Sequence, residues 1–443
     1  MSGLRSRGLA TALLIASVCA EVPARALDLE RVLAEVAEAN PSLAARQHEA
    51  AAARAHARRA GAWDAPMLEL SAVNVPAGGG FDQDPMTMRM IGVVQQVDLF
   101  GARGLERRAA LGDARAADAM TDGARWERFA DAWQAYADAY FSAQRAEAAR
   151  AHHDVMDRMV AASRARYEAG RGRLDELLRA DAERARITAD AVTFGAEELG
   201  ARARLDALRG RAPGARPDSL AAPPEWLAPD SAAAWRDAVA AHPRLRVLSE
   251  QETARRTAAS AARRMTWPEL SLRAAYGFRS TLADGTTQDD MWSAGVGLML
   301  PIGTGSRQGA ETAEMAAMAE GYAAQRRGEA LDLAAELGAL RAQALAARRG
   351  ARLLTDTVLV AQRRALAAAW NAYESGTTDL SSVLESAHAS YSEELDVARA
   401  RQELARVLAR LLAVTARGEL LGVRVPATPD AGVPATRPLG GAR

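Results

Sequence analysis

The chain contains an internal duplication, which constrains its architecture more than any other feature. Three short stretches of the first half recur in the second: Pro41-Ser42-Leu43 as Pro243-Arg244-Leu245, Pro66-Met67-Leu68-Glu69-Leu70 as Pro268-Glu269-Leu270-Ser271-Leu272, and Tyr167-Glu168-Ala169-Gly170 as Tyr373-Glu374-Ser375-Gly376. Each half has the same order of parts: a helix, two strands, a long helix, a Tyr-x-x-Gly break and another helix. A duplicated unit of this kind is rare among enzymes, so the repeat largely decides the architecture.

Composition favours closely packed helices over a globular core. Aromatic residues make up only 5% of the 443 residues, while alanine is abundant. Small side chains suit close helix contacts, and few aromatics exclude bulky globular cores. The 56 basic residues, all of them arginine, balance 56 acidic residues, so the formal charge is zero. This balance argues against a nucleic-acid-binding protein.

Residues 1–26 have the features of an export signal peptide. Two arginines precede an apolar stretch over residues 9–20, and Ala24-Arg25-Ala26 fits the A-x-A pattern of a cleavage site. Cleavage after Ala26 removes Cys19, the only cysteine, so the mature chain has no disulfide. Lipidation of Cys19 is the alternative. No other segment reaches the roughly 18 consecutive apolar residues of a membrane-spanning helix, so entry into a membrane requires strands.

Six segments are predicted to be helical because apolar residues recur at helical spacing; they span residues 28–62, 102–168, 174–209, 231–264, 306–373 and 379–416. The spacing in the last segment indicates a helix packed lengthwise against partners, although it also fits a simple coiled coil. The segment 102–168 would span roughly 100 Å, so two shorter helices are needed to return over that distance. We expect 174–209 to stack on 231–264, and 379–416 to stack on 28–62.

Four further segments, each about nine to eleven residues long, are predicted to be strands: Met67–Val75, Thr87–Val97, Leu270–Arg279 and Trp292–Leu300. This length crosses a bilayer as a tilted strand, and aromatic residues at the strand ends fit the lipid interface. A soluble hairpin has a similar pattern, but the export signal favours membrane strands. Four strands cannot close a barrel, and open edges in lipid leave backbone groups unpaired. A trimer, with twelve strands in total, is therefore expected.

The predicted fold class is mostly α with a small β part. A long α-helical coiled-coil barrel is continued by a transmembrane β-barrel, and a trimer of internally duplicated chains forms both. The predicted domains, in chain order, are a signal peptide (1–26), a first structural repeat (27–229, with a β-hairpin at 66–98 and a helical hairpin tip near 170), a second structural repeat (230–418, with a β-hairpin at 268–302 and a tip near 376) and a disordered tail (419–443).

Several motifs, in this order and duplicated, carry a family resemblance over the mature chain up to about residue 416: Asn40-Pro41, Gln95-Gln96-Val97-Asp98-Leu99-Phe100-Gly101, Leu300-Pro301-Ile302-Gly303 and the two Tyr-Glu-x-Gly tips. With these motifs the chain resembles the TolC-like outer-membrane efflux proteins, the exit ducts of tripartite pumps. The resemblance implies a passive homotrimeric duct in the outer membrane, with its helical part in the periplasm. It also implies two protein partners, a periplasmic adaptor and an inner-membrane pump of the resistance-nodulation-division type.

The segment Asp84-Pro85-Met86-Thr87-Met88-Arg89-Met90, followed by Gln95-Gln96, is most similar to the heavy-metal (CzcC-type) branch of that family. This resemblance implies efflux of metal cations. The usual proline near Asp98 and the usual lysine after Gly101 are missing here. A duct for drugs or for type I protein secretion, and a soluble periplasmic coiled-coil scaffold, are the alternatives.

The two Tyr-Glu-x-Gly tips carry the candidate functional residues. A glycine there allows the backbone angles that end one helix, so a plain turn is the simpler interpretation. The resemblance adds contact with the adaptor, by Ala169, Gly170, Arg171, Ser375, Gly376 and Thr377. It also places Glu176 and Glu385 at the periplasmic aperture, where threefold symmetry makes each a ring of carboxylates that attracts cations. A solvated helix face is the simpler interpretation of these two.

Other chemistry-bearing residues give no site. Met86, Met88 and Met90 share a strand face, and thioethers suit Cu(I), but a lipid-facing or lumen-packing stripe is the simpler interpretation. Four histidines lack metal-site spacing and are expected on the surface: His48, His56, His152 and His153. No nucleophile elbow, phosphate-binding loop, zinc-protease helix or cysteine pair is present in the sequence. The sequence therefore predicts no enzyme, no cofactor and no metal site.

Overall fold

A computed structural model describes residues 26–214, 219–227, 232–303 and 305–426. Its elements, in chain order, are α1 (Leu29–Ala39), α2 (Pro41–Ala60), β1 (Met67–Val73), β2 (Met88–Val97), α3 (Ala102–Glu168), α4 (Leu174–Leu208), α5 (Ala232–Ala240), α6 (Pro243–Arg264), β3 (Glu269–Arg279), β4 (Met291–Met299), α7 (Gly305–Leu353), the π-helix η1 (Leu354–Val358), α8 (Leu359–Glu374), α9 (Leu380–Thr415) and the 3-10 helix η2 (Gly418–Leu421). The predicted signal peptide, with Cys19, lies outside the described residues apart from Ala26.

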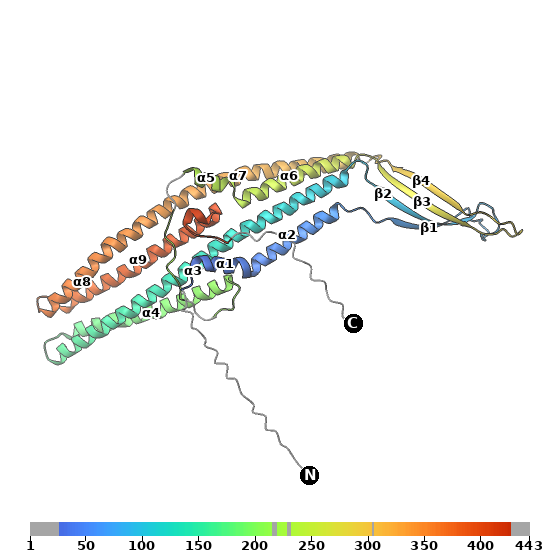
Figure 1. Cartoon of the computed structure of the whole chain (residues 1–443). Helices are drawn as coiled ribbons and strands as arrows, with labels where there is room; N and C mark the ends of the chain where they lie inside the picture. Colours follow the sequence, from blue (N-terminus) through green and yellow to red (C-terminus); the bar gives the residue numbers. More distant parts are fainter. Residues whose placement is uncertain (1–25, 215–218, 228–231, 304, 427–443) are drawn as a thin grey trace, which may run out of the picture.

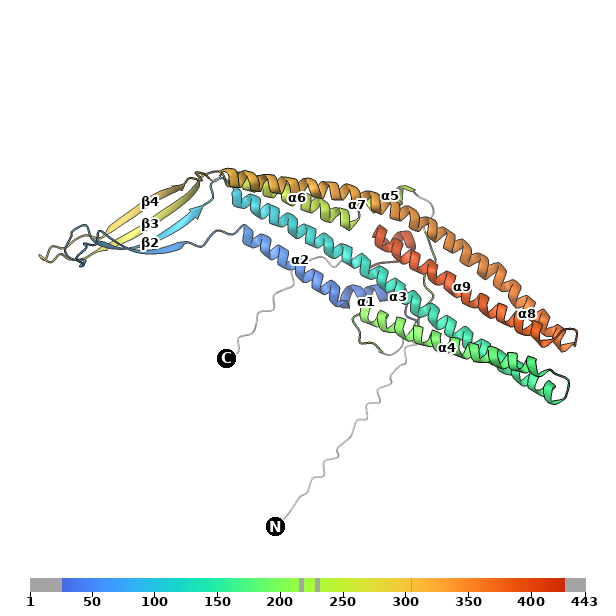
Figure 2. The same ribbon diagram turned by 180° about the vertical axis from the view of Figure 1, so that it is seen from behind.

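The molecule is elongated, with a β-sheet at one end and two helical hairpin tips at the other (Figures 1 and 2). The four strands pair antiparallel in the order β1-β2-β3-β4. Next to the sheet, α2 packs on α3, α3 on α6 and α6 on α7, so the helices repeat the order of the strands that they join. One layer therefore runs from the sheet into the helical part.

The long helices begin and end close to the predicted positions, but three predicted helices are interrupted. The segment 102–168 forms one helix, α3. The segment 28–62 is broken at Asn40, and the segment 231–264 is broken before Pro243. In both cases a proline lacks the N–H needed inside a helix and instead takes the first position of the next one. The third interruption is η1, between α7 and α8.

The two proline-led helices begin with equivalent joints. The Asn40 side chain accepts hydrogen bonds from the N–H groups of Ser42 (3.0 Å) and Leu43 (3.3 Å), and its Nδ2 donates to the Leu208 carbonyl oxygen at the end of α4 (2.7 Å). In the second repeat, His242 Nδ1 accepts from the Arg244 N–H (3.2 Å), and Nε2 lies 2.9 Å from the Ala413 carbonyl oxygen near the end of α9. Each residue caps one helix and holds the end of another.

These joints show that the predicted stacking of helices was wrong. The end of α4 meets the start of α2, and the end of α9 meets the start of α6, instead of α4 meeting α6 and α9 meeting α2. The next helix in the chain, α5, accordingly packs on α7 and α9, not on α4. In Figures 1 and 2, α4 accordingly continues the line of α1 and α2 along α3.

The largest hydrophobic core lies midway along the molecule, where the helix ends meet. It combines Val32 and Leu33 of α1, Phe129 and Trp133 of α3, and many residues of α7 and α9. Leu421 and Val423 are also buried in this core. The predicted disordered tail therefore starts too early at residue 419, because residues 419–426 pack on the core; the rest of the tail lies outside the described residues.

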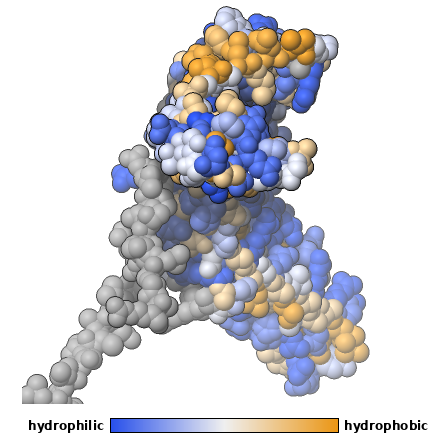
Figure 3. All heavy atoms as spheres, turned by 90° about the vertical axis from the view of Figure 1, so that its right-hand side faces the viewer, coloured by the Kyte–Doolittle hydropathy of each residue, from blue (hydrophilic) through white to orange (hydrophobic). Residues whose placement is uncertain are grey.

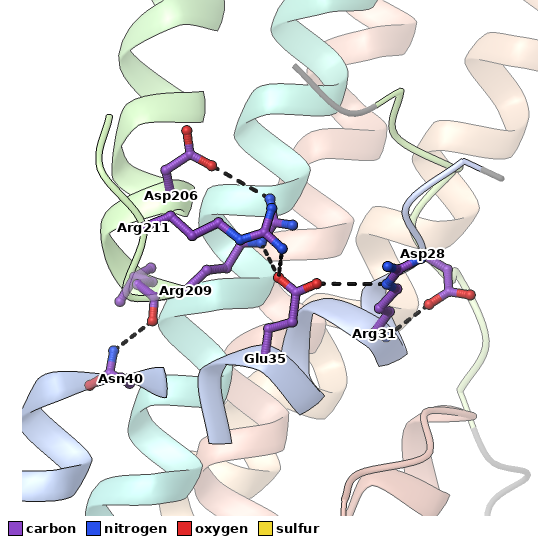
Figure 4. Close-up of polar contacts among 8 residues, drawn as sticks. Asp28, Arg31, Glu35, Asn40, Asp206, Arg209 and Arg211 are labelled. Atoms are coloured by element: carbon purple, nitrogen blue, oxygen red, sulfur yellow. Dashed lines mark hydrogen bonds and ion pairs between the residues drawn. The ribbon is translucent and has the colours of Figure 1, made fainter. Parts of the chain in front are cut away.

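An ion-pair cluster fastens α1 to the end of α4 beside this core (Figure 4). Arg209 is the central group: its side chain is only 3% exposed, and its Nε lies 2.6 Å from Glu35 Oε2. Arg211 also reaches Glu35 Oε2, at 3.0 Å, and Arg31 lies 3.6 Å from the other carboxylate oxygen. The shared carboxylate of Glu35 thus holds the joint from the α1 side.

We predict that Arg209→Met lowers the midpoint of thermal unfolding far more than Arg31→Met. Removing a buried partner leaves the Glu35 carboxylate under-compensated, which costs about 3 kcal/mol, at the lower end for broken buried pairs because Arg211 remains. The Arg31 side chain is 65% exposed, so its loss costs under about 1 kcal/mol. Circular dichroism of the detergent-solubilised protein measures both. Equal midpoints for the two variants would contradict the conclusion that Arg209 is the central group of the ion-pair cluster.

We predict that His242→Asn makes stability less dependent on pH. Burial lowers the pKa of His242 below its ordinary value of 6.5, and the positive charge of Arg244 acts in the same direction. The unfolded chain therefore binds the proton more readily, so the stability is fully present above about pH 6.5 and is lost as the pH falls below it. Asparagine keeps the cap and the donor, as Asn40 does in the first repeat.

The measurement is the unfolding midpoint of each protein at about pH 7.5 and about pH 5.5. The drop in midpoint on acidification should be smaller for His242→Asn than for the wild type. It should not vanish, because burial also lowers the pKa of His152. His48→Asn, a change at an exposed position, is the matched control and should keep the wild-type drop. An unchanged drop in His242→Asn would show that the joint does not titrate.

Candidate functional site

Both helical hairpin tips have the same turn geometry. Gly170 and Gly376 have φ angles of 70° and 74°, the left-handed region in which a side chain costs energy. At the first tip the Arg171 N–H donates to the Arg166 carbonyl oxygen (2.9 Å). At the second, the Thr377 N–H donates to the Ala372 carbonyl oxygen (2.9 Å). These bonds close each helix over its left-handed glycine, as in a Schellman motif.

All six predicted contact residues at the tips are exposed: Ala169, Gly170, Arg171, Ser375, Gly376 and Thr377. The two tips lie at the same end of the molecule (Figures 1 and 2). They form one surface, because the guanidinium carbon of Arg166 in α3 lies 4.7 Å from the centre of the Tyr373 ring in α8. This cation–π contact joins the α3–α4 hairpin to the α8–α9 hairpin.

A groove between the tips is lined by Tyr373 of the second tip motif and by residues that the sequence did not single out, including Arg166, Arg173 and Asp379. Arg173 binds Asp175 through two hydrogen bonds, of 2.8 and 3.2 Å. The Ser381 hydroxyl and the Ser382 N–H donate to Asp379, which lowers the pKa of that carboxyl group. The equivalence of Tyr167 and Tyr373 in the repeat was the available signal for this groove.

The structure does not bring the two predicted aperture carboxylates together within one chain. Glu176 lies in the first turn of α4 and lines the groove between the tips. Glu385 lies on α9 and is exposed, and it does not line this groove. A ring of either carboxylate therefore depends on other copies of the chain.

His152 corrects one expectation about the surface histidines. Its side chain is buried, and its ring meets the Tyr391 ring edge-on at 4.7 Å between centres. Burial lowers the pKa of His152. His48 and His56 are exposed as expected, and His153 is half-buried beside Asp157 (3.5 Å). Two adjacent helix residues point about 100° apart, so only one of this pair faces the core.

The sheet has one apolar and one polar face. The strand register groups the following residues on the apolar face: Leu68, Leu70, Ile91, Val93, Leu272, Tyr276, Phe278, Trp292, Val296 and Leu298. The opposite face carries an ion pair between Arg273 and Glu69 (2.6 Å), together with Ser271 and Arg279. In a view from the sheet end, hydrophobic residues gather along one side and hydrophilic residues cover the loops (Figure 3). Such a sheet separates an apolar from an aqueous environment.

The described ranges contain neither a membrane-spanning helix nor a cluster of metal ligands. No helix there is both long and apolar enough to cross a membrane. No group of three or more His, Cys, Asp or Glu side chains in this part of the chain is placed to hold a metal ion.

The sequence matches a family described as outer membrane efflux protein over residues 32–211 and 235–417. The chain belongs to this family. Its members are passive channels of the outer membrane with a periplasmic helical part, not enzymes, so the predicted TolC-like family, fold class and localisation are confirmed. Members act as homotrimers with periplasmic adaptors and resistance-nodulation-division pumps, which confirms the predicted partners at the level of the family. The alternative of a soluble scaffold is thereby excluded.

Solved structures share the fold. They include a membrane protein from Pseudomonas aeruginosa (22% identity, TM-score 0.72, covering 87% of this chain and 90% of that one), the outer membrane protein VceC from Vibrio cholerae (18%, 0.72, 90% and 97%) and the open state of the Neisseria gonorrhoeae MtrE outer membrane channel (19%, 0.71, 88% and 89%). No curated protein matches the sequence. At these identities the comparison supports the fold of the efflux protein and leaves its substrate open.

We predict that Gly170→Ala opens the first tip locally. A side chain in the left-handed region costs roughly 1–2 kcal/mol, so the Arg171 amide should exchange its hydrogen roughly 5- to 30-fold faster. Hydrogen exchange read by mass spectrometry of the tip peptide measures this. Gly195→Ala is the control: it lies inside α4 with free space at its Cβ position, and it should leave exchange at the tip unchanged. Unchanged exchange in Gly170→Ala would refute the prediction.

Proposed function

We propose that this efflux protein is the outer-membrane duct of a tripartite system that exports heavy-metal cations. The duct is passive, and the inner-membrane pump supplies the energy. The observation that carries the proposal is that, within the described ranges, two sets of surfaces have no partner: the edges of the sheet and a second apolar side of the helices. The metal cargo is supported by the similarity of Asp84–Met90 and Gln95-Gln96 to the heavy-metal branch.

The sheet edges support assembly into a ring. β1 and β4 each pair on one side only, and every residue of β4 is exposed. Unpaired backbone groups cost several kcal/mol each in lipid, so β4 of one copy has to pair with β1 of the next. Three copies give twelve strands, an even number large enough to enclose a lumen. The polar face with Glu69 and Arg273 then lines the lumen, and the apolar face meets lipid.

The helices support the same assembly. α4 buries one apolar side, with Ile187 and Phe194, inside the chain. On a second side, Leu178, Val192 and Leu199 are exposed at intervals of one or two heptads. On the other repeat, Leu331, Leu345 and Leu353 of α7 and Val360 of α8 are exposed at intervals of 14, 8 and 7 residues. Heptad spacing is typical of helices that pack lengthwise. We therefore place α4 of one copy against the α7–α8 helices of the next.

The tips are the proposed adaptor contact. Ala169, Gly170, Arg171, Ser375, Gly376 and Thr377 are exposed at one end of the molecule and belong to turns with the same geometry. An adaptor with its own repeated motif can therefore bind both tips in the same way. Near the tips, Glu176 and Glu385 are the proposed aperture carboxylates. In a trimer each forms a ring of three negative charges, which favours the passage of cations.

We predict that deletion of the gene for this chain makes its source strain sensitive to a group of heavy metals. Growth is measured with zinc, cadmium, cobalt, nickel, copper and silver, and with a panel of dyes and detergents. Sensitivity to metals alone, restored by the wild-type gene, is the expected result, because the pump then has no exit. Sensitivity only to dyes and detergents would contradict the metal cargo and support the drug duct; unchanged tolerance of both, with loss of an exported polypeptide, would support type I secretion.

A tip variant makes the test specific to docking. Arg171→Glu/Thr377→Glu changes two exposed tip side chains and should fail to restore metal tolerance, although the protein reaches the outer membrane. Gln83→Glu/Thr287→Glu adds carboxylates to exposed loop positions at the opposite end and is the matched control. It should restore tolerance. Restoration by both variants would show that the tips do not contact the adaptor.

A further inference from the structure

Three methionines surround Gly277 on one face of the sheet. In the strand register, Gly277 of β3 pairs with Met90 of β2 on one side and with Met291 of β4 on the other. A Cβ atom added at Gly277 would lie 3.0 Å from the sulfur of Met88. The Met88 side chain therefore fills the space over the glycine, and Met90 and Met291 are the cross-strand neighbours of that glycine on its two sides. We call Met88, Met90 and Met291 the thioether cluster.

The thioether cluster lies on the polar face of the sheet. Residues two apart along a strand share a face, so Met88 and Met90 lie on the same side as Ser71 and Val73, with which β1 pairs them across the strands. The same face carries Arg273 and Arg279. Met291 is 46% exposed, and Met88 and Met90 are half-buried. In the proposed assembly this face lines the lumen, so the three sulfur atoms are open to water and ions.

We propose that the thioether cluster binds a soft monovalent cation, Cu(I) or Ag(I), in the lumen near the loop end of the sheet. Thioethers are soft ligands that select Cu(I) and similar ions, whereas carboxylates and carbonyls suit hard cations. The inference rests on the proposed function as a metal duct, and it narrows the cargo to soft monovalent ions. Met86, at the end of the preceding loop, is also exposed and lies next to the entry of β2.

The charges around the cluster favour a monovalent over a divalent ion. Arg279 Nη1 lies 3.9 Å from the sulfur of Met291, so a guanidinium group stands beside the site. Asp290 places a carboxylate nearby, which accepts hydrogen bonds from the backbone N–H of Arg279 (2.9 Å) and from the Tyr276 hydroxyl (2.8 Å). The three sulfur ligands are neutral. A divalent ion there has no ligand carboxylate and meets twice the repulsion from Arg279.

The position of the cluster suits a site that releases its ion. Conduction requires binding that is strong enough for an ion to enter and weak enough for it to leave. Three neutral thioethers, open to the lumen, meet that condition better than thiolates or a closed carboxylate cage. Each protomer supplies one cluster, so the trimer carries three of them around the lumen beyond the helical tube.

The competing interpretation is packing, in which methionine only fills the space over Gly277. Leucine has a similar volume and no sulfur, so methionine-to-leucine changes separate the two roles. The test variant is Met88→Leu/Met90→Leu/Met291→Leu. The matched control is Met67→Leu/Met299→Leu, which changes two methionines on the same face near the helical end, where they pair with Val94 and Glu269.

The experiment titrates Ag(I) into the purified full-length trimer in detergent and follows binding by isothermal calorimetry, with Zn(II) as the comparison ion. The wild type and the control variant should bind Ag(I) at one site per chain, and the thioether variant should lose that binding. Zn(II) should give no binding that the variant removes. All three proteins must show the same trimer on a native gel and the same circular dichroism. Absence of Ag(I) binding by the wild type, or equal binding by the thioether variant, overturns the proposal.

The outcomes separate this inference from the proposed function. A deletion strain that is sensitive to zinc or cadmium, with a wild-type protein that does not bind Ag(I), supports the metal duct and overturns the thioether site. A strain with unchanged metal tolerance, with Ag(I) binding that only the thioether variant loses, supports the site and overturns the metal cargo. Sensitivity to copper and silver that the thioether variant fails to relieve, while the control variant relieves it, supports both.

Discussion

Close packing of small side chains along α3 is the interaction on which the rest of the structure depends. Alanine is the commonest buried residue of this 67-residue helix, with 12 of the 25 buried positions, and α3 packs on α2, α4, α6 and α9. Alanine loses no side-chain entropy on burial, so a contact of this length stabilises without bulky residues. Large side chains such as Phe129, Trp133 and Tyr136 occur where helix ends meet and more volume has to be filled. One helix can therefore connect the sheet to the tips.

The sequence predicted the parts of the fold that depend on local pattern. α3 begins and ends as expected because its periodicity extends over tens of residues. The positions of the tips could be predicted because a left-handed turn favours glycine, which stands at 170 and 376. The stacking of helices was predicted wrongly, since it depends on single hydrogen bonds such as that from Asn40 to Leu208. Such partners lie far apart in the chain, and no periodicity records them. The burial of His152 against Tyr391 has the same origin.

The candidate sites divide in the same way. The duplicated motif was sufficient to locate both tips, but the groove between them depends on contacts between the two hairpins, such as that of Arg166 with Tyr373. Alternation along β2 predicted that Met88 and Met90 share a face, while Met291 joins them only through the strand register across Gly277. The rings proposed for Glu176 and Glu385 are the hardest part to predict, because each ring needs the carboxylates of three chains and one sequence does not show how the copies are arranged.

The two joints between stacked helices, α4 with α2 and α9 with α6, have similar geometry but different chemistry. Asn40 makes the first with a neutral amide that does not titrate, whereas His242 makes the second with a ring whose two nitrogens are both in use. In a threefold ring, each chain supplies one joint that does not titrate, between α4 and α2, and one that loosens in acid, between α9 and α6. The two kinds of joint therefore alternate around the axis. The tube therefore does not soften evenly: acid weakens the joint between α9 and α6, in one helix column of the four that each chain supplies, while the joint between α4 and α2 is unchanged.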